Sequence, residues 1–248
     1  PDAKFIYRPS DVMMYDGALP RFAKLEEHIM KEVDLNIFVQ PDYEQFYASK
    51  IADFYDTVKF TTISNGVDIE PFEQKYEIPE ELKKNNTALY IGAWQADWNL
   101  IFKSAEQKKE YNFIIVCPNK PDSSILKKIP EYQNVTYIPG IMPVEIPKWM
   151  TNCNVFIVPY LKEVRANRGF GVTAKFYQAM AAKKPIVAYN ETYQVAEIGI
   201  PVVDNSEDFI RELEKAMKTT SVEYKYDLES KRWSTLKDSF IETLENLF

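Results

Sequence analysis

In the first quarter of the chain, short continuous runs of apolar residues alternate with segments in which apolar residues are spaced as in a helix. Three short apolar runs predict strands, at 4–7, 35–39 and 58–63. Between the first two runs, apolar residues recur every three or four positions, which predicts a helix over about 20–33. Pro41 and Asp42 open a second predicted helix that extends to about Phe54. This block alternates strands with helices but holds too few strands for a complete domain.

A longer set of strand–helix units follows a segment at about 68–86 that is rich in Glu, Lys and Pro. Five strands are predicted, at 87–91, 112–117, 135–138, 154–158 and 185–188. The helices predicted between them are at about 98–108, 123–128, 145–151 and 173–182. Near-continuous apolar strands are typical of parallel sheets covered on both faces. The alternation therefore predicts a doubly wound, Rossmann-like sheet. Three more helices are predicted to close the chain, at about 206–218, 222–232 and 234–247.

Composition and charge narrow the class of protein. With 46% hydrophobic and 27% charged residues, the chain can bury a core and is not a disordered type. A net charge of −7 argues against a dedicated nucleic-acid binder, although a local basic cleft for one phosphorylated ligand is compatible with it. No apolar run approaches the roughly 20 residues that a membrane span needs. The expected location is the cytoplasm.

Cysteine and histidine usage disfavours several kinds of site. Cys117 and Cys153 each lie beside an apolar run and are expected to be buried free thiols. The single histidine, His28, disfavours most histidine-based metal sites and a Ser-His-Asp triad. The chain begins with Pro1 rather than Met, so we interpret it as a fragment.

Candidate binding residues follow the strands of the second block, because an open parallel sheet binds ligands beyond the carboxyl ends of its strands. They are Gly92 and Trp94 after the first strand, Gly140, Ile141 and Met142 after the third, and Tyr160 after the fourth. A glycine at such a position lets the backbone approach a ligand closely. Gly92 could also be an ordinary tight turn, and Tyr160 could belong to the core.

A basic segment separates Tyr160 from the next predicted helix. It contains Arg165 and Arg168, and the helix begins near Thr173 with Lys175 in its first turn. Free backbone N–H groups at a helix start, together with nearby cations, form a site for an anion. The alternatives are that the arginines are solvated loop charges and that Lys175 extends along the helix surface.

Residues 175–187 (KFYQAMAAKKPIV) resemble a signature of bacterial glycosyltransferases with the GT-B fold. Three other segments match the same families in the same order: 63–68 (ISNGVD), 137–140 (YIPG) and 158–160 (VPY). The resemblance covers nearly the whole chain. It implies an α/β fold of two Rossmann-like domains with parallel sheets, the N-terminal one incomplete. The implied parts are a partial acceptor-side domain at 1–68, a linker at 69–84, a nucleotide-sugar domain at 85–218, and C-terminal helices at 219–248 that pack back toward the N-terminal domain.

Within this fold, the spacing of Tyr160, Lys175 and Gln178 resembles that of the xanthan-type glucuronosyltransferase, an inverting enzyme with a UDP-sugar donor and a lipid-linked acceptor. Residues 7–11 (YRPSD) resemble the stretch that holds its catalytic aspartate, which implies that Asp11 is the general base. The alternative is that Asp11 caps a helix or a turn. Arg168 stands where many retaining relatives have the first of two glutamates, which weakens an assignment to the retaining group.

The implied activity is transfer of a sugar from a nucleotide diphosphate, expected to be UDP, to a glycan or lipid-linked acceptor in bacterial surface polysaccharide synthesis. Lys175, Arg165 and Arg168 would stabilise the leaving diphosphate without a metal ion. Gln178 would lie near the ribose, and the base near Gly140, Ile141 and Met142. No cofactor, metal ion or nucleic acid is expected.

Two rival functions and one question of location stay open at this stage. One rival is a sugar-nucleotide epimerase of the same fold, and the other is a non-catalytic nucleotide-sugar binding or partner subunit. Peripheral association with the inner face of the cytoplasmic membrane is also left open.

Overall fold

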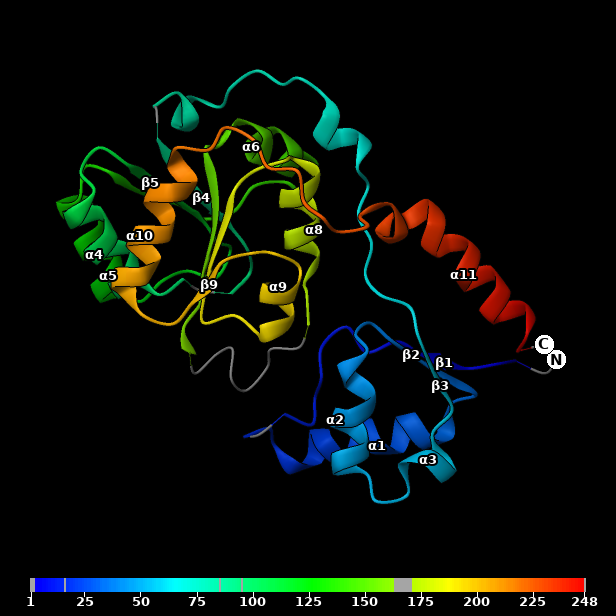
Figure 1. Cartoon of the computed structure of the whole chain (residues 1–248). Helices are drawn as coiled ribbons and strands as arrows, with labels where there is room; N and C mark the ends of the chain where they lie inside the picture. The colour runs from blue at the N-terminus through cyan, green and yellow to red at the C-terminus, as the bar shows by residue number, and fades with distance from the viewer. Residues whose placement is uncertain (1–2, 16, 85, 95, 163–170, 248) are drawn as a thin grey trace.

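The computed structural model describes residues 3–15, 17–84, 86–94, 96–162 and 171–247. Within these ranges the strands form two sheets, one of six strands in the order β6-β5-β4-β7-β8-β9 and one of three in the order β1-β2-β3. Every strand pairing in them is parallel. The smaller sheet and its helices lie beneath the larger unit (Figure 1). The predicted α/β class with two parallel sheets is confirmed.

The larger sheet follows the predicted strands closely. Its strands are β4 (Thr87–Ile91), β5 (Asn112–Val116), β6 (Val135–Ile138), β7 (Val155–Pro159), β8 (Ile186–Tyr189) and β9 (Val202–Val203). Its helices are α4 (Trp98–Gln107), α5 (Ser123–Lys128), α6 (Ile146–Asn152), α8 (Ala174–Ala181), α9 (Tyr193–Glu197) and α10 (Ser206–Met217). The short elements α9 and β9 were not predicted.

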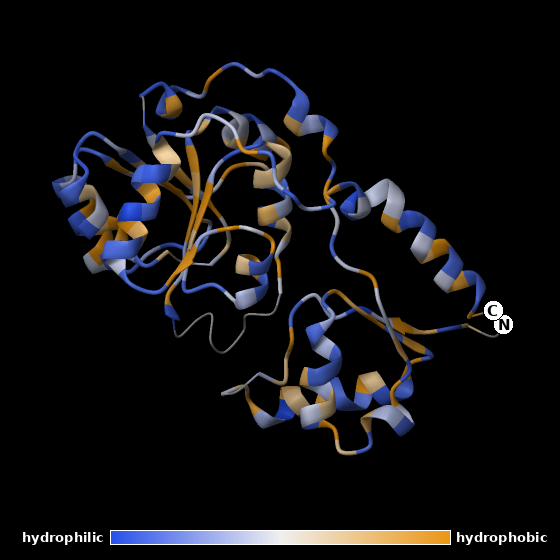
Figure 2. Ribbon diagram, viewed as in Figure 1, coloured by the Kyte–Doolittle hydropathy of each residue, from blue (hydrophilic) through white to orange (hydrophobic). Residues whose placement is uncertain are grey.

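Burial explains why the apolar runs form the centre of this sheet. α4 and α10 lie on one face, while α6 and α8 lie on the other (Figure 1). The strands between them appear as an apolar layer flanked by more polar helices (Figure 2). In β5, Phe113 to Val116 are all buried, as strands covered on both faces must be. Cys117 and Cys153 are buried and free, as predicted.

The smaller sheet is built from β1 (Ile6–Tyr7), β2 (Leu35–Phe38) and β3 (Phe60–Thr62). Its helices are α1 (Pro20–Glu32), α2 (Asp42–Lys50) and α3 (Phe54–Thr57). The prediction of one helix from Pro41 to Phe54 is wrong, because the chain becomes extended at Ile51. Ile51 is buried in the apolar core of this domain, and ending α2 at Lys50 allows its side chain to reach that core.

The two faces of the smaller sheet are covered by different parts of the chain. Phe38 of β2 faces α2, where its ring stacks on Tyr47 at 5.3 Å between centroids. The neighbouring Ile37 faces the other way and packs with Ile63 and with Leu236 of α11 (Trp233–Glu245). The C-terminal helix therefore completes the N-terminal core.

The predicted helix at 222–232 is wrong. Apart from a single 3₁₀ turn (Glu229–Lys231), this segment is non-helical and runs along the larger domain. Its half-buried side chains alternate with exposed ones, as an extended chain requires. Tyr224 donates its hydroxyl to the carbonyl of Lys184 at 2.6 Å, and the Tyr226 ring stacks on Tyr177 at 5.8 Å. These contacts favour the extended form over a helix.

The chain crosses between the domains twice, and the two crossings pair with each other. The Val67 N–H donates to the carbonyl of Lys231 at 2.8 Å, and the Trp233 N–H donates back to the carbonyl of Val67 at 3.3 Å. Gly66 lies against the second crossing so closely that an added Cβ would stand 2.7 Å from the Trp233 ring and 2.9 Å from the Lys231 carbonyl. The backbone approach therefore requires glycine at this position.

We expect Gly66→Ala to lower the free energy of unfolding by about 1–3 kcal/mol, because overpacking against a backbone carbonyl cannot relax by a change of rotamer. Urea unfolding measures the effect. Ser234→Ala, an exposed change on α11, is the control and should stay within about 0.5 kcal/mol of the wild type. Equal stabilities for the two variants would contradict the close backbone approach at Gly66.

Candidate functional site

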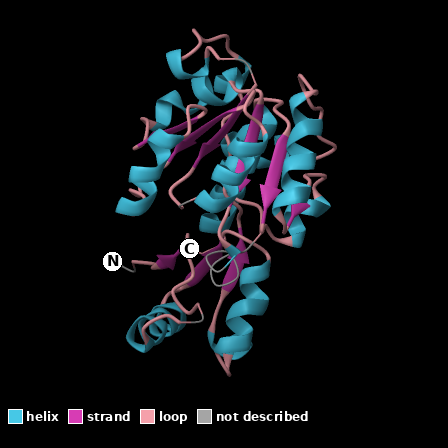
Figure 3. Ribbon diagram, turned by 90° about the vertical axis from the view of Figure 1, so that its left-hand side faces the viewer, coloured by secondary structure: helices cyan, strands magenta, loops and turns pink. Residues whose placement is uncertain are grey.

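The candidate site lies where the carboxyl ends of the larger sheet meet the smaller domain (Figure 3). Its centre is Lys175 in the first turn of α8. The Lys175 ammonium donates a hydrogen bond to the Tyr160 hydroxyl. It also lies 4.6 Å from the centroid of the Tyr160 ring and 5.5 Å from that of Tyr90. Two tyrosine rings thus border the cation, and the Tyr160 hydroxyl accepts its hydrogen bond.

Gly92 and Trp94 complete a group that we call the lysine cluster, made of Tyr90, Gly92, Trp94, Tyr160 and Lys175. A Cβ at Gly92 would lie 2.5 Å from the Tyr90 hydroxyl and 3.1 Å from the Lys175 nitrogen. The Tyr90 hydroxyl donates to the carbonyl of Trp94 at 2.6 Å, and the Trp94 ring lies 5.3 Å from that of Tyr160. The structure therefore brings four of the predicted residues together, and glycine is what leaves room for the lysine.

Burial keeps the neighbours of Lys175 neutral. It raises the pKa of the Tyr90 phenol well above its ordinary value. It also raises the pKa of the Cys117 thiol, against the opposite and smaller effect of the Lys175 charge. Neither group is a thiolate or phenolate at neutral pH, so neither cancels the charge of the ammonium.

The start of α8 adds polar groups beside this cation. Thr173 precedes the helix in an extended conformation, so the backbone N–H groups of Ala174 and Lys175 have no partner within the helix, whereas that of Phe176 donates to the Thr173 carbonyl at 3.0 Å. The Thr173 hydroxyl is buried and makes no hydrogen bond with the described residues. Gln178 lies three residues beyond Lys175 and is half-buried. Arg165 and Arg168 lie outside the described residues, and their roles stay predictions.

The loop after β6 lies along the same edge of the sheet. Gly140 has a φ of +121°, and its Cβ position would be 3.8 Å from Pro118, in the loop after β5. The Tyr137 hydroxyl donates to the carbonyl of Cys117 at 2.9 Å. Ile141 packs on the core, whereas Met142 is 65% exposed. Cys117 links this loop to the lysine cluster, because its sulfur lies 3.5 Å from the carbonyl of Trp94.

Asp11 stands on the opposite side, in the loop that follows β1. Its side chain is exposed and lines a cavity of about 310 Å³ together with Met13, Phe22 and Trp94. Trp94 also belongs to the lysine cluster, so the cavity joins Asp11 to that cluster. Asp11 does not cap α1, because the helix begins at Pro20 and its N-cap residue is Leu19.

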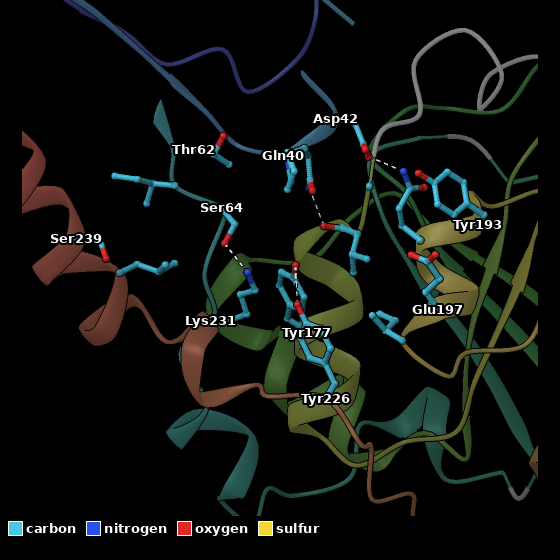
Figure 4. A pocket seen from close by; sticks show the side chains of 17 residues that line it. Gln40, Asp42, Thr62, Ser64, Tyr177, Tyr193, Glu197, Tyr226, Lys231 and Ser239 are labelled. Carbon is cyan, nitrogen blue, oxygen red and sulfur yellow. Dashed lines mark hydrogen bonds between the residues drawn. The ribbon is translucent and has the colours of Figure 1, made fainter. Parts of the chain in front are cut away.

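A second, larger cavity of about 440 Å³ lies between the domains (Figure 4). Hydrogen bonds cross between the domains at its walls, from Gln40 to the carbonyl of Val172 at 2.8 Å and from Gln194 to Asp42. Lys231 donates to the Ser64 hydroxyl at 3.1 Å, and burial lowers the pKa of this lysine. Val172, which accepts the Gln40 hydrogen bond, directly precedes Thr173, so this bond connects the start of α8 to the smaller domain.

Sequence reasoning missed Tyr90 and Cys117. Both belong to runs that pattern analysis assigns to the core, and both are buried. The available signal was a tyrosine near the carboxyl end of an otherwise aliphatic strand, two residues before Gly92. A buried phenol needs a hydrogen-bond partner, and here that need places it in the site.

The described residues contain no group of three or more His, Cys, Asp or Glu side chains that could hold a metal ion. No helix among them is long and apolar enough to cross a membrane.

Several solved structures are similar to this chain. HepE from Anabaena in complex with UDP-glucose has a TM-score of 0.71 at 14% identity, covering 98% of this chain and 72% of HepE. The pneumococcal O-GlcNAc transferase GtfA in complex with UDP and GlcNAc has a TM-score of 0.66 at 12% identity, covering 98% and 52%. TarM has a TM-score of 0.64 at 13% identity, covering 99% and 50%.

These likenesses confirm the predicted GT-B type of fold, and the chain spans about half the length of GtfA and TarM. A search of curated protein sequences gives no match. The family model of glycosyl transferases group 1 matches residues 86–219, which is more than half of the chain and contains the whole lysine cluster. This chain therefore belongs to the glycosyl transferases group 1 family.

Proposed function

We propose that this protein transfers a hexose from a UDP-sugar to a saccharide or lipid-linked acceptor, in the synthesis of a bacterial surface polysaccharide. The observation that carries the proposal is the Lys175 ammonium, held at the start of α8 in a cluster whose Trp94 lines the same cavity as Asp11. UDP-glucose in HepE and UDP in GtfA support a UDP-sugar as the donor. The proposed place of action is the cytoplasmic side of the membrane.

In the proposed reaction, one bond forms, one bond breaks and one proton is transferred. The oxygen of an acceptor hydroxyl attacks the anomeric carbon, while the bond from that carbon to the diphosphate oxygen breaks. The bonding electrons leave with UDP, and Asp11 accepts the hydroxyl proton as the general base. Attack from the face opposite the leaving group inverts the anomeric centre, as in the xanthan-type enzyme that the sequence resembles.

The leaving diphosphate gains negative charge as its bond to the sugar breaks. In this proposal Lys175 and the N–H groups at the start of α8 stabilise that charge, and fixed donors of this kind lower the barrier most when they need no rearrangement. We therefore propose that no metal ion takes part. The predicted arginines, Arg165 and Arg168, would add to this stabilisation.

We expect UDP to bind more tightly than UMP, because only UDP has a second phosphate for Lys175. Lys175→Ala should weaken UDP binding by about 1.5–3 kcal/mol, the usual loss for a charge-assisted hydrogen bond. Isothermal titration calorimetry measures both effects, with Lys127→Ala, an exposed lysine on α5, as the control. Equal affinities for UMP and UDP would remove the reason for placing the diphosphate here.

The metal-free proposal has a direct test. EDTA should leave both UDP affinity and turnover of the donor unchanged, because protein groups carry the charge of the leaving group. The measurement is hydrolysis of UDP-glucose and UDP-N-acetylglucosamine, with water as the acceptor, before and after chelation. A strict need for magnesium or manganese would overturn the proposal.

Asp11→Asn should leave UDP affinity nearly intact, because in the proposed reaction Asp11 meets the acceptor and not the diphosphate. Turnover should fall by about a hundredfold or more, as it does when a general base is lost. Asp56→Asn, an exposed change on α3 in the same domain, is the control. Unimpaired turnover of Asp11→Asn would refute the assigned base. A wild-type protein that binds UDP-sugars without ever turning them over would favour a binding subunit.

A further inference from the structure

Glu26 is a buried carboxyl group that the proposed reaction does not use. It lies on α1 with 0% of its surface exposed, inside the aromatic and aliphatic core of the smaller domain. Burying a carboxyl group is costly unless hydrogen bonds replace its water. Desolvation accordingly raises the pKa of Glu26. A carboxyl at such a position needs a reason beyond filling space.

Its partners come from three separate parts of the chain. One carboxyl oxygen accepts hydrogen bonds from the hydroxyls of Tyr7 in β1, at 3.1 Å, and Tyr47 in α2, at 2.9 Å. The other oxygen accepts the backbone N–H of Met13 at 2.9 Å. Met13 is two residues beyond Asp11. Glu26 thus joins the fixed elements of the domain to the loop that carries the proposed base.

That loop is also fixed on both sides of Asp11. Val12 and Met14 point into the core, with 9% and 6% exposure, while Met13 between them is 40% exposed. The Tyr43 hydroxyl donates to the carbonyl of Ser10 at 3.2 Å. The backbone from 10 to 14 is therefore held at both ends, while the Asp11 side chain stays exposed in the cavity that it shares with Trp94.

We propose that Glu26 is a positioning residue that fixes the 10–14 loop so that the Asp11 carboxyl faces the cavity shared with Trp94. This inference rests on the proposed role of Asp11. Glu26 touches neither donor nor acceptor in this assignment and acts only through the loop backbone.

The hydrogen bonds of Glu26 predict which substitutions at this position preserve the conformation of the 10–14 loop. Glu26 acts as an acceptor toward all three of these donors. Glutamine has the same length, and its carbonyl oxygen can accept the Met13 N–H. Its amide can donate to Tyr7 and Tyr47, because hydroxyl hydrogens rotate to suit their partners. Aspartate keeps the charge but is one methylene shorter, so it cannot reach both tyrosines and Met13. The length of the side chain at position 26, rather than its charge, should therefore determine kcat.

The test compares Glu26→Gln, Glu26→Asp and Glu26→Ala by three readouts, which are UDP affinity, kcat and KM for UDP-glucose hydrolysis, and hydrogen exchange of the amides at 12–15. Glu26→Asp and Glu26→Ala should lower kcat by about ten- to a hundredfold, the scale expected for a misplaced catalytic group. Exchange of the Met13 amide should speed up in both, with UDP affinity and KM within about twofold of wild type. Glu26→Gln should keep kcat within about threefold. If Glu26→Ala fails to fold, the proposal is still tested by whether kcat of Glu26→Gln exceeds that of Glu26→Asp.

Ile51→Ala is the matched control, because it opens the same core without touching Glu26. Its kcat per folded molecule should stay near that of the wild type. Equal losses of kcat in Ile51→Ala and Glu26→Asp would show a merely structural role and overturn the proposal. So would a Glu26→Asp protein with wild-type kcat, or one more active than Glu26→Gln. Failure of the proposed function is separate, because it would appear as an active Asp11→Asn protein whatever the hydrogen exchange shows.

Discussion

The three-stranded sheet has apolar side chains on both faces, and the arrangement of the molecule depends on covering both. Successive residues of a strand point to opposite faces, so Phe38 and Ile37 need different partners. Helices that follow the strands in sequence cover Phe38, but the cover for Ile37 comes from α11 at the far end of the chain. The chain must therefore return from the larger domain, which it does beside Gly66 and Val67. The same return fixes how the two sheets face each other.

This placement sets the geometry of the site. Asp11 comes from the smaller domain and the lysine cluster from the larger one, so their separation is a property of the domain interface. The Gln40 and Gln194 hydrogen bonds brace that interface near α8, at a distance from the α11 contact. Two supports at different places resist rotation better than one. We infer that packing far from Lys175 defines the cavity between Asp11 and Trp94.

The sequence predicted the parts of the molecule that local pattern controls. Strands β4 to β8 follow their predicted bounds to within one residue, because near-continuous apolar runs have sharp ends. The helix predicted at 222–232 is wrong because its tyrosines find partners on the larger domain, which the sequence alone does not show.

Tertiary partners account for what local pattern could not show at the site. The sequence placed Lys175, Tyr160, Gly92 and Trp94 among the candidates, and the structure brings them together. Nothing local distinguishes Glu26 from a solvated residue of α1, because its burial is created by Tyr7 and Tyr47 from other elements. Tyr90 is similar, since its phenol becomes part of the site only once β4 lies beside α8.

On each side of the site, neutral groups hold an ionisable side chain, which is Lys175 in the larger domain and Glu26 in the smaller one. A carboxylate beside Lys175 would fix the ammonium but would also compete with an incoming diphosphate for its charge. Tyr90 and Tyr160 border the cation as neutral groups, Tyr160 through a hydrogen bond to its hydroxyl, and leave that charge available. On the other side, tyrosine hydroxyls and a backbone N–H hold Glu26, and through it the loop of Asp11. Neutral supports therefore suit a reaction in which negative charge develops on one side of the cavity and a proton departs on the other.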